Sequence, residues 1–155
     1  MNRTNPIKFG TDGWRAVIAQ DFTFDNVRIC AQGVADYLNQ SGLAAKGLVI
    51  GYDTRFASEN FAGAVAEVAA ANGIKVYLSS HAIPTPEASF ATVDREAGAA
   101  VVITASHNPA GYNGFKVKSA DGASAPSEMI EEIEKNIHRI FDSGEVKQMP
   151  LADAL

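Results

Sequence analysis

The residue best placed for chemistry is Ser106, in the stretch Thr-Ala-Ser-His-Asn-Pro over residues 104–109. The uncharged run over 98–103 precedes it and predicts a buried strand that ends in a loop just before the serine. A loop at the end of a buried strand exposes a hydroxyl on a rigid support, as a covalent nucleophile requires. The alternative is a serine that only caps the following turn.

Two kinds of group transfer could use such a serine. Acyl transfer is disfavoured because His107 is adjacent in sequence, where side chains diverge, and because the Gly-x-Ser-x-Gly pattern is absent. Phosphoryl transfer requires an exposed nucleophile and several cations around an anionic group. Arg15, Arg55 and Lys116 lie near glycine-containing turns, where backbone can approach a phosphate closely. The pattern therefore favours phosphoryl transfer.

Composition indicates what kind of chain must position these groups. Its 155 residues, 46% of them hydrophobic, are enough for one compact domain. A net charge of −5 gives no general reason to bind nucleic acid or an anionic membrane. No apolar stretch reaches the ~18 residues of a membrane span, and the single cysteine excludes an internal disulfide. We expect a cytoplasmic protein without nucleic-acid or membrane partners.

Short apolar runs alternate with segments of helical periodicity, as in layered α/β domains. We expect strands over 47–53, 74–78, 99–104 and 113–118. We expect helices over 24–41, from an N-cap at Ser58 to about residue 73, over 85–95, and from 126 onward. These elements predict a three-layer α/β/α sandwich around a four-stranded, mostly parallel (mixed) sheet. The last strand can run antiparallel because too few residues precede it for a crossover helix.

Four motifs occur along the chain: Lys8-Phe-Gly-Thr-Asp-Gly-Trp-Arg15, Gly51-Tyr-Asp-Thr-Arg55, Thr104-Ala-Ser-His-Asn-Pro109 and Tyr112-Asn-Gly-Phe-Lys116. Together they resemble the first domain of the α-D-phosphohexomutases, the family of phosphoglucomutase and phosphomannomutase. The resemblance covers nearly the whole chain, with one departure at Ala16, where glycine is commoner in the family. It implies that residues 1–149 form domain I, and that 150–155 form a tail or the start of a linker to a missing second domain.

The resemblance also implies a mechanism. Ser106 would be carried as a phosphoserine that gives its phosphoryl group to a hexose phosphate and recovers one from the resulting bisphosphate. His107 and Lys116 would be catalytic beside it, with Lys116 favoured for the proton role, and Arg15 would bind phosphate. Ser106 would also be a ligand of Mg²⁺, whose remaining ligands are expected outside this chain. The partners would be a hexose phosphate and the remaining domains of the same polypeptide.

Each of these residues has a structural alternative. His107 could be a loop histidine that hydrogen-bonds only to backbone, and Lys116 could be a solvated lysine on a strand. Arg15 could pair with Asp12 across its turn. Arg55 is expected to brace its loop together with the neighbouring aspartate instead of contacting substrate.

The chain as a whole allows two interpretations. The first is the phosphoserine domain of a mutase, an intramolecular phosphotransferase, which is expected to be inactive alone because the aspartate-rich metal loop and the sugar-binding loop of the family are missing. The alternative is a stand-alone phosphate-binding or interaction module without catalysis.

Overall fold

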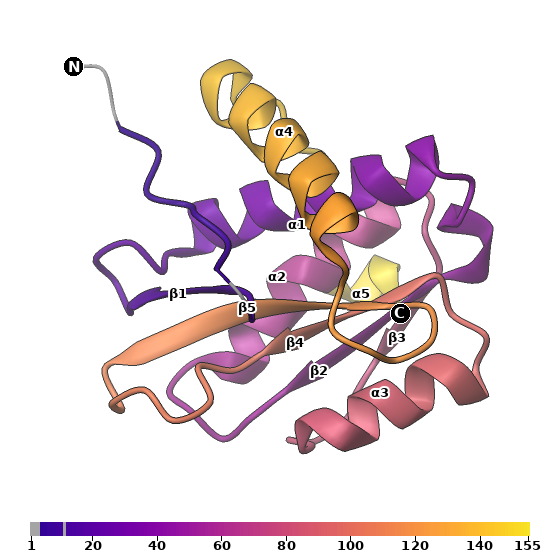
Figure 1. The fold of residues 1–155 in the computed structure, drawn as a ribbon, viewed down its shortest axis with the longest axis horizontal. Helices are drawn as coiled ribbons and strands as arrows, with labels where there is room; N and C mark the ends of the chain where they lie inside the picture. Colours follow the sequence, from indigo (N-terminus) through magenta and orange to yellow (C-terminus); the bar gives the residue numbers. More distant parts are fainter. Residues whose placement is uncertain (1–3, 11) are drawn as a thin grey trace.

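The computed structural model describes residues 4–10 and 12–155 and shows a β-sheet with helices on both faces (Figure 1). Its strands are β1 (Trp14–Val17), β2 (Leu48–Tyr52), β3 (Val76–Leu78), β4 (Ala99–Ile103) and β5 (Tyr112–Ser119). Its helices are α1 (Phe24–Gln40), α2 (Ser58–Ala71), α3 (Thr85–Asp94), α4 (Ser127–Ser143) and α5 (Leu151–Ala154), with a 3-10 turn, η1, at Ala44–Lys46. The layered α/β architecture is therefore confirmed.

The sheet is mixed, with the strand order β1-β5-β4-β2-β3. β2 pairs in parallel with β3 and β4, whereas β5 pairs antiparallel with both β4 and β1. Among the described strands only β5 is reversed, which confirms the mostly parallel sheet and the antiparallel final strand. The sheet has five strands and not the expected four, because the short β1 gives too weak an alternation to be recognised from sequence.

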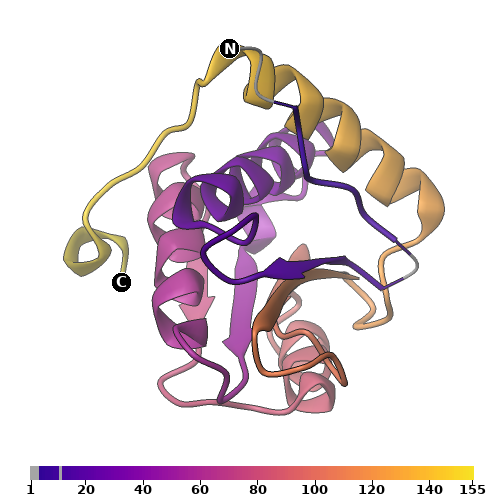
Figure 2. The same ribbon diagram turned by 90° about the vertical axis from the view of Figure 1, so that its left-hand side faces the viewer.

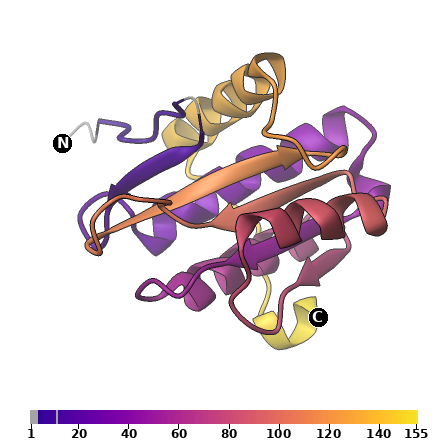
Figure 3. The same cartoon turned by 60° about the horizontal axis from the view of Figure 1, so that its bottom comes forward.

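Helices α1 and α2 lie on one face of the sheet, α3 lies on the other, and α4 packs against α1 (Figures 2 and 3). The apolar stripe of α1 faces the core, with each of its four members fully buried: Val27, Cys30, Val34 and Leu38. Burial raises the pKa of the Cys30 thiol well above its ordinary value, so this cysteine is an inert core residue.

The start of α2 differs from the expected one. Ala57, with a φ of +59°, occupies the N-cap position, and Ser58 is the first helical residue. The prediction of Ser58 as the cap is wrong because its hydroxyl donates to Asp53 in the preceding loop.

The C-terminal segment returns along α1 and α2. The backbone N–H of Lys147 donates to Oε1 of Gln32 at 3.0 Å, and Leu151 of α5 lies against Gly63 of α2. Residues 150–155, expected to be a tail or linker, thus include a helical turn packed on the domain, and the boundary at residue 149 stays a prediction. None of the helices within residues 4–10 and 12–155 is long and apolar enough to cross a membrane.

Candidate active site

The serine loop, residues 104–109, leaves the end of β4 and turns sharply at Ser106. The backbone φ of Ser106 is +57°, in the left-handed region that residues other than glycine rarely adopt. Its N–H donates to Oγ1 of Thr104 at 3.1 Å, and the N–H of Asn108 donates to the carbonyl of Ala105 at 3.1 Å. Ser106 is exposed, and its hydroxyl has no hydrogen-bond partner among the described residues. The loop therefore presents an unengaged hydroxyl on a constrained backbone.

Arg55, at the end of the neighbouring strand β2, braces this loop. Its Nη1 donates to the carbonyls of Pro109 at 2.8 Å and Tyr112 at 3.0 Å, and its Nη2 donates to those of Ser106 at 2.9 Å and Asn108 at 2.6 Å. One planar guanidinium thus satisfies four carbonyls of the turn. The expected pairing of Arg55 with Asp53 in its own loop is confirmed, and the contacts of Arg55 with the serine loop are an addition that the sequence did not predict.

Asp53 orients Arg55 and extends the support inward. Its Oδ2 lies 3.3 Å from Nε of Arg55, and its Oδ1 accepts the hydroxyl of Ser58 at 2.7 Å. Nδ2 of the fully buried Asn113 donates to Oγ of Ser58 at 2.9 Å, and its Oδ1 accepts the N–H of Gly114 at 2.9 Å. This chain of hydrogen bonds ties β2, α2 and β5 together beneath the serine loop.

Two glycines allow the elements of the site to approach one another. A Cβ on Gly114 would collide with the carbonyl oxygen of Thr104, and a Cβ on Gly13, whose φ is +89°, would lie 2.5 Å from the carbonyl oxygen of Phe115. Gly114 pairs with Arg15 across β1 and β5. The close packing therefore places Arg15 of β1 beside the serine loop.

The cation cluster, Arg15 and Lys116 with the carboxylate of Asp12, lies beside the loop. Nζ of Lys116 is 2.6 Å from Oδ2 of Asp12, and Nη2 of Arg15 is 3.3 Å from the same oxygen. Nη1 of Arg15 donates to Oδ1 of Asn108 at 2.9 Å. The Lys116 hydrogen bond, with the charges of Lys116, Arg15 and Lys118, lowers the pKa of Asp12 although partial burial opposes this.

The predicted site residues are brought into one region but are not all in contact. Arg15 reaches the serine loop through Asn108 and reaches Lys116 through Asp12. Among the described residues, no hydrogen bond joins Ser106 to Lys116. The hypothesis that Arg15 pairs with Asp12 is confirmed, and this pairing coexists with the contact to the loop.

Lys116 and His107 lie in contrasting surroundings. The hypothesis of a solvated Lys116 is wrong because only 8% of its side chain is exposed. His107 is exposed and has no hydrogen-bond partner within residues 4–10 and 12–155, so no backbone contact there supports a purely structural role. The catalytic roles of both residues stay predictions.

The sequence did not reveal that Asn108 would contact Arg15 or that Asn113 would support Asp53 through Ser58. Both asparagines lie inside the recognised motifs, and this was the only sequence feature that pointed to a role for them. Their partners lie 93 and 55 positions away in sequence, and no local pattern identifies contacts between residues so far apart.

Magnesium needs several oxygen ligands, commonly carboxylates. In the part of the chain that the structure describes, no group of three or more His, Cys, Asp or Glu side chains could hold a metal ion. The exposed Ser106 hydroxyl could contribute one ligand once phosphorylated, but these residues do not form a complete magnesium site by themselves.

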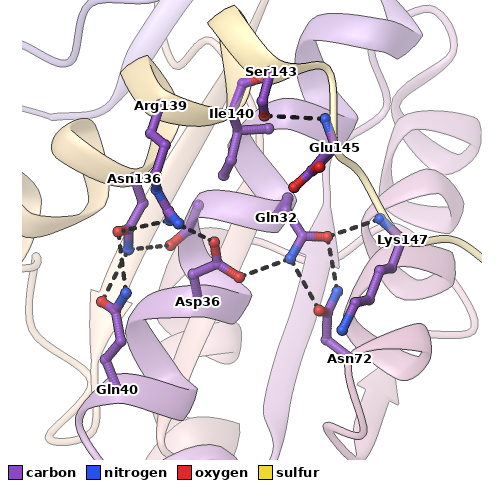
Figure 4. Close-up of polar contacts among 11 residues, drawn as sticks. Gln32, Asp36, Gln40, Asn72, Asn136, Arg139, Ile140, Ser143, Glu145 and Lys147 are labelled. Carbon is purple, nitrogen blue, oxygen red and sulfur yellow. Dashed lines mark hydrogen bonds and ion pairs between the residues drawn. The ribbon is translucent and has the colours of Figure 1, made fainter.

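A second polar region, the helix cluster, lies between α1, α2 and α4 (Figure 4). Its members are Gln32, Asp36, Gln40, Asn72, Asn136 and Arg139. The amides of Gln32 and Asn72 exchange two hydrogen bonds of 2.9 Å, and Nη2 of Arg139 donates to Asp36 at 2.8 Å. These groups pair with one another, so the cluster joins the helices through a network of polar side chains.

Comparison with known sequences places these motifs in a wider context. A family model described as "Phosphoglucomutase/phosphomannomutase, alpha/beta/alpha domain I" matches residues 6–143. A curated relative, the "Probable phosphoribomutase" of Schizosaccharomyces pombe, is 41% identical over 157 residues, which cover 95% of this chain and 27% of the relative. The chain therefore spans about a quarter of the length of this relative.

Solved structures share the same fold. A candidate phosphomannomutase from Thermus thermophilus superposes with a TM-score of 0.80 and 40% identity, over 85% of this chain and 30% of its own. A phosphoglucomutase/phosphomannomutase family protein from Burkholderia thailandensis gives a TM-score of 0.76 and 27% identity, over 95% of this chain and 34% of its own. The architecture described above is thus that of a domain found within longer proteins.

Proposed function

The chain belongs to the phosphoglucomutase/phosphomannomutase family, as its alpha/beta/alpha domain I, and from this we propose that it carries the phosphoserine of a hexose-phosphate mutase. The observation that carries the proposal is the serine loop itself. Ser106 is exposed on a left-handed turn that Arg55 braces through four carbonyls, with the guanidinium of Arg15 anchored to the same loop. A constrained, accessible hydroxyl beside paired cations suits the transfer of an anionic group.

In the proposed reaction, the bond between phosphorus and Oγ of Ser106 breaks as a sugar hydroxyl oxygen bonds to the same phosphorus. The sugar hydroxyl loses its proton, and the product is a hexose bisphosphate. Transfer of the other phosphoryl group back to Ser106 restores the phosphoserine and completes the exchange between the 1- and 6-positions. Arg15 would hold phosphate oxygens, because its guanidinium can donate two parallel hydrogen bonds.

The two remaining catalytic candidates suit different tasks. The family resemblance favours Lys116 for the proton, but the ion pair of Lys116 with Asp12 supports a role as a cation that offsets phosphate charge. His107 is exposed next to Ser106 and is free of partners among the described residues, so it is available to handle the hydroxyl proton. Both residues remain part of the proposed site.

The metal and the substrate complete the proposal. Phosphorylated Ser106 would give one oxygen to Mg²⁺, which neutralises charge during phosphoryl transfer, and the other ligands would come from outside this chain. The sugar would be bound largely by further domains of the same polypeptide. We therefore expect the isolated chain not to interconvert hexose phosphates in a coupled mutase assay.

The test is a Ser106→Ala variant of a full-length protein that carries this domain. Removing the nucleophile should lower mutase turnover by at least about 10⁴-fold, as for other covalent catalysts. Thermal unfolding should change little, since an exposed hydroxyl without partners is removed. Ser127→Ala, at an exposed serine that begins α4, is the matched control and should retain turnover. Normal turnover of the Ser106→Ala variant would sink the proposal.

A further inference from the structure

Asp12 is the acid of the cation cluster, and one of its two carboxylate oxygens, Oδ2, contacts both cations. That oxygen lies 2.6 Å from Nζ of Lys116 and 3.3 Å from Nη2 of Arg15. Its other oxygen, Oδ1, has no hydrogen-bond partner among the described residues. The carboxylate therefore occupies the position where an anion shared by the two cations would lie.

Lys116 and Asp12 are buried to different extents. Lys116 has only 8% of its side chain exposed, whereas Asp12 has 43% exposed. A buried ammonium is costly to leave unpaired, so Lys116 requires an anion at all times. An exposed carboxylate can be rehydrated at little cost, so Asp12 can leave if another anion takes its place.

The serine loop is where a replacing anion would arrive. Nη1 of Arg15 donates to Oδ1 of Asn108, two residues after Ser106, so the guanidinium that contacts Asp12 also contacts this loop. A phosphoryl group carries a charge of about −1.5 to −2 and three strong acceptor oxygens. It would repel the Asp12 carboxylate and bind Arg15 and Lys116 more strongly than a single carboxylate oxygen does.

We propose that Asp12 is an internal substitute for the phosphoryl group: its carboxylate pairs with Arg15 and Lys116 while Ser106 is unphosphorylated, and phosphate at the loop displaces it. This inference rests on the proposed function, because it assigns the anion that occupies the same site while Ser106 lacks phosphate. Asp12 then competes with phosphate and holds the two cations in place while Ser106 lacks its phosphoryl group.

The test is a calorimetric titration of this chain with inorganic phosphate. Asp12→Asn removes the competing charge and should bind phosphate at least tenfold more tightly than the unaltered chain. Asp142→Asn, at an exposed aspartate near the end of α4, makes the same change in net charge and should bind like the unaltered chain. Equal or weaker binding by Asp12→Asn, relative to Asp142→Asn, overturns the inference.

A second measurement needs no variant and so does not depend on the folding of Asp12→Asn. The ¹³C resonance of the Asp12 carboxylate in the unaltered chain should move toward that of a hydrated carboxylate as phosphate is added, and an unchanged resonance would contradict displacement. Neither experiment requires turnover or covalent phosphorylation. Normal turnover of the Ser106→Ala variant would therefore refute the proposed function without deciding whether phosphate displaces Asp12. Likewise, unchanged phosphate binding by Asp12→Asn would refute the displacement without deciding the proposed function.

Discussion

The serine loop with its cation cluster and the helix cluster are both polar, yet they are built differently. In the helix cluster, amides pair with amides and Arg139 pairs with Asp36, so polar groups of three helices satisfy one another (Figure 4). Beside the serine loop, Arg15 and Lys116 share one carboxylate, and the hydroxyl of Ser106 has no partner among the described residues. Two cations that share one carboxylate, together with a serine hydroxyl that has no partner among the described residues, are features of a functional site. A structural network instead pairs its polar groups with one another.

Two arginines, one in each region, show this difference most clearly. Arg55 and Arg139 each pair with an aspartate, but Arg55 is 15% exposed and also binds four loop carbonyls, whereas Arg139 is 59% exposed on α4. The position of Ser106 depends on Arg55, because Arg55 holds the carbonyls of its loop. Arg139 contributes an ion pair with Asp36 and a hydrogen bond to Asn136, both within the helix cluster.

Among the changes that compare the two regions, the largest effect is expected from Arg55→Ala in a full-length protein that carries this domain. Four carbonyls lose their donor and Ser106 can leave its left-handed conformation, so mutase turnover should fall by about 10²-fold or more. Arg55→Lys keeps the charge without the planar fork, so its turnover should lie between that of Arg55→Ala and that of the unaltered protein. Steady-state kinetics measure both.

Arg139→Ala is the control for that series. An exposed ion pair contributes about 0–1 kcal/mol, so turnover should be unchanged and unfolding only slightly easier. If Arg139→Ala and Arg55→Ala lost the same activity, the distinction between the two regions would be wrong.

The next effect concerns the contact between β5 and the serine loop. Gly114→Ala places a Cβ against the carbonyl of Thr104 and should lower the free energy of unfolding by about 3 kcal/mol. Gly111→Ala is the matched control, because a Cβ there meets nothing within 4 Å, and its effect should stay within about 0.5 kcal/mol. Urea unfolding distinguishes them, and equal stabilities would show that the close approach is unimportant.

A change in the helix cluster should affect stability without affecting the site. Gln32→Ala removes the side chain that exchanges hydrogen bonds with the amide of Asn72 and accepts the backbone N–H of Lys147, which should cost about 2 kcal/mol of unfolding free energy. Phosphate binding by the folded variant should be unchanged in the calorimetric titration. Weaker phosphate binding would mean that the helix cluster also shapes the site.

The smallest effect is the dependence of stability on pH. The pKa of Asp12 is lowered in the folded chain from its ordinary value of 3.8, first by its hydrogen bond from Lys116. Its contribution to stability is therefore complete above about pH 4 and is lost as the pH falls through the folded pKa. Because the carboxylate is partly exposed, we expect a loss below about 1 kcal/mol. Asp12→Asn should lack this part of the acid dependence, and an identical profile in chemical unfolding would contradict the pairing.

Much of the fold followed from local pattern. The stripe of α1 and the apolar runs of β2 and β4 are repeated signals over whole elements, so they identified helix and strands correctly. The four-residue β1 was missed because it is defined by pairing with β5 and not by its own sequence. The cap at Ser58 was wrong because a contact with Asp53 redirected its hydroxyl.

The candidate site was only partly predictable for the same reason. Ser106 and Arg55 stand at strand ends in recognisable motifs, so their positions and the pairing of Arg55 with Asp53 followed from the sequence. The sharing of Asp12 between Arg15 and Lys116 did not, since that geometry depends on how β1 packs beside β5. Long-range packing decides such contacts.

Phosphopeptide mass spectrometry on an active full-length protein that carries this domain, after incubation with a hexose bisphosphate, tests directly whether Ser106 is the phosphoryl carrier. We expect one phosphoryl group, located on Ser106. A phosphoryl group on another residue, or none in a preparation that turns over substrate, would contradict this expectation.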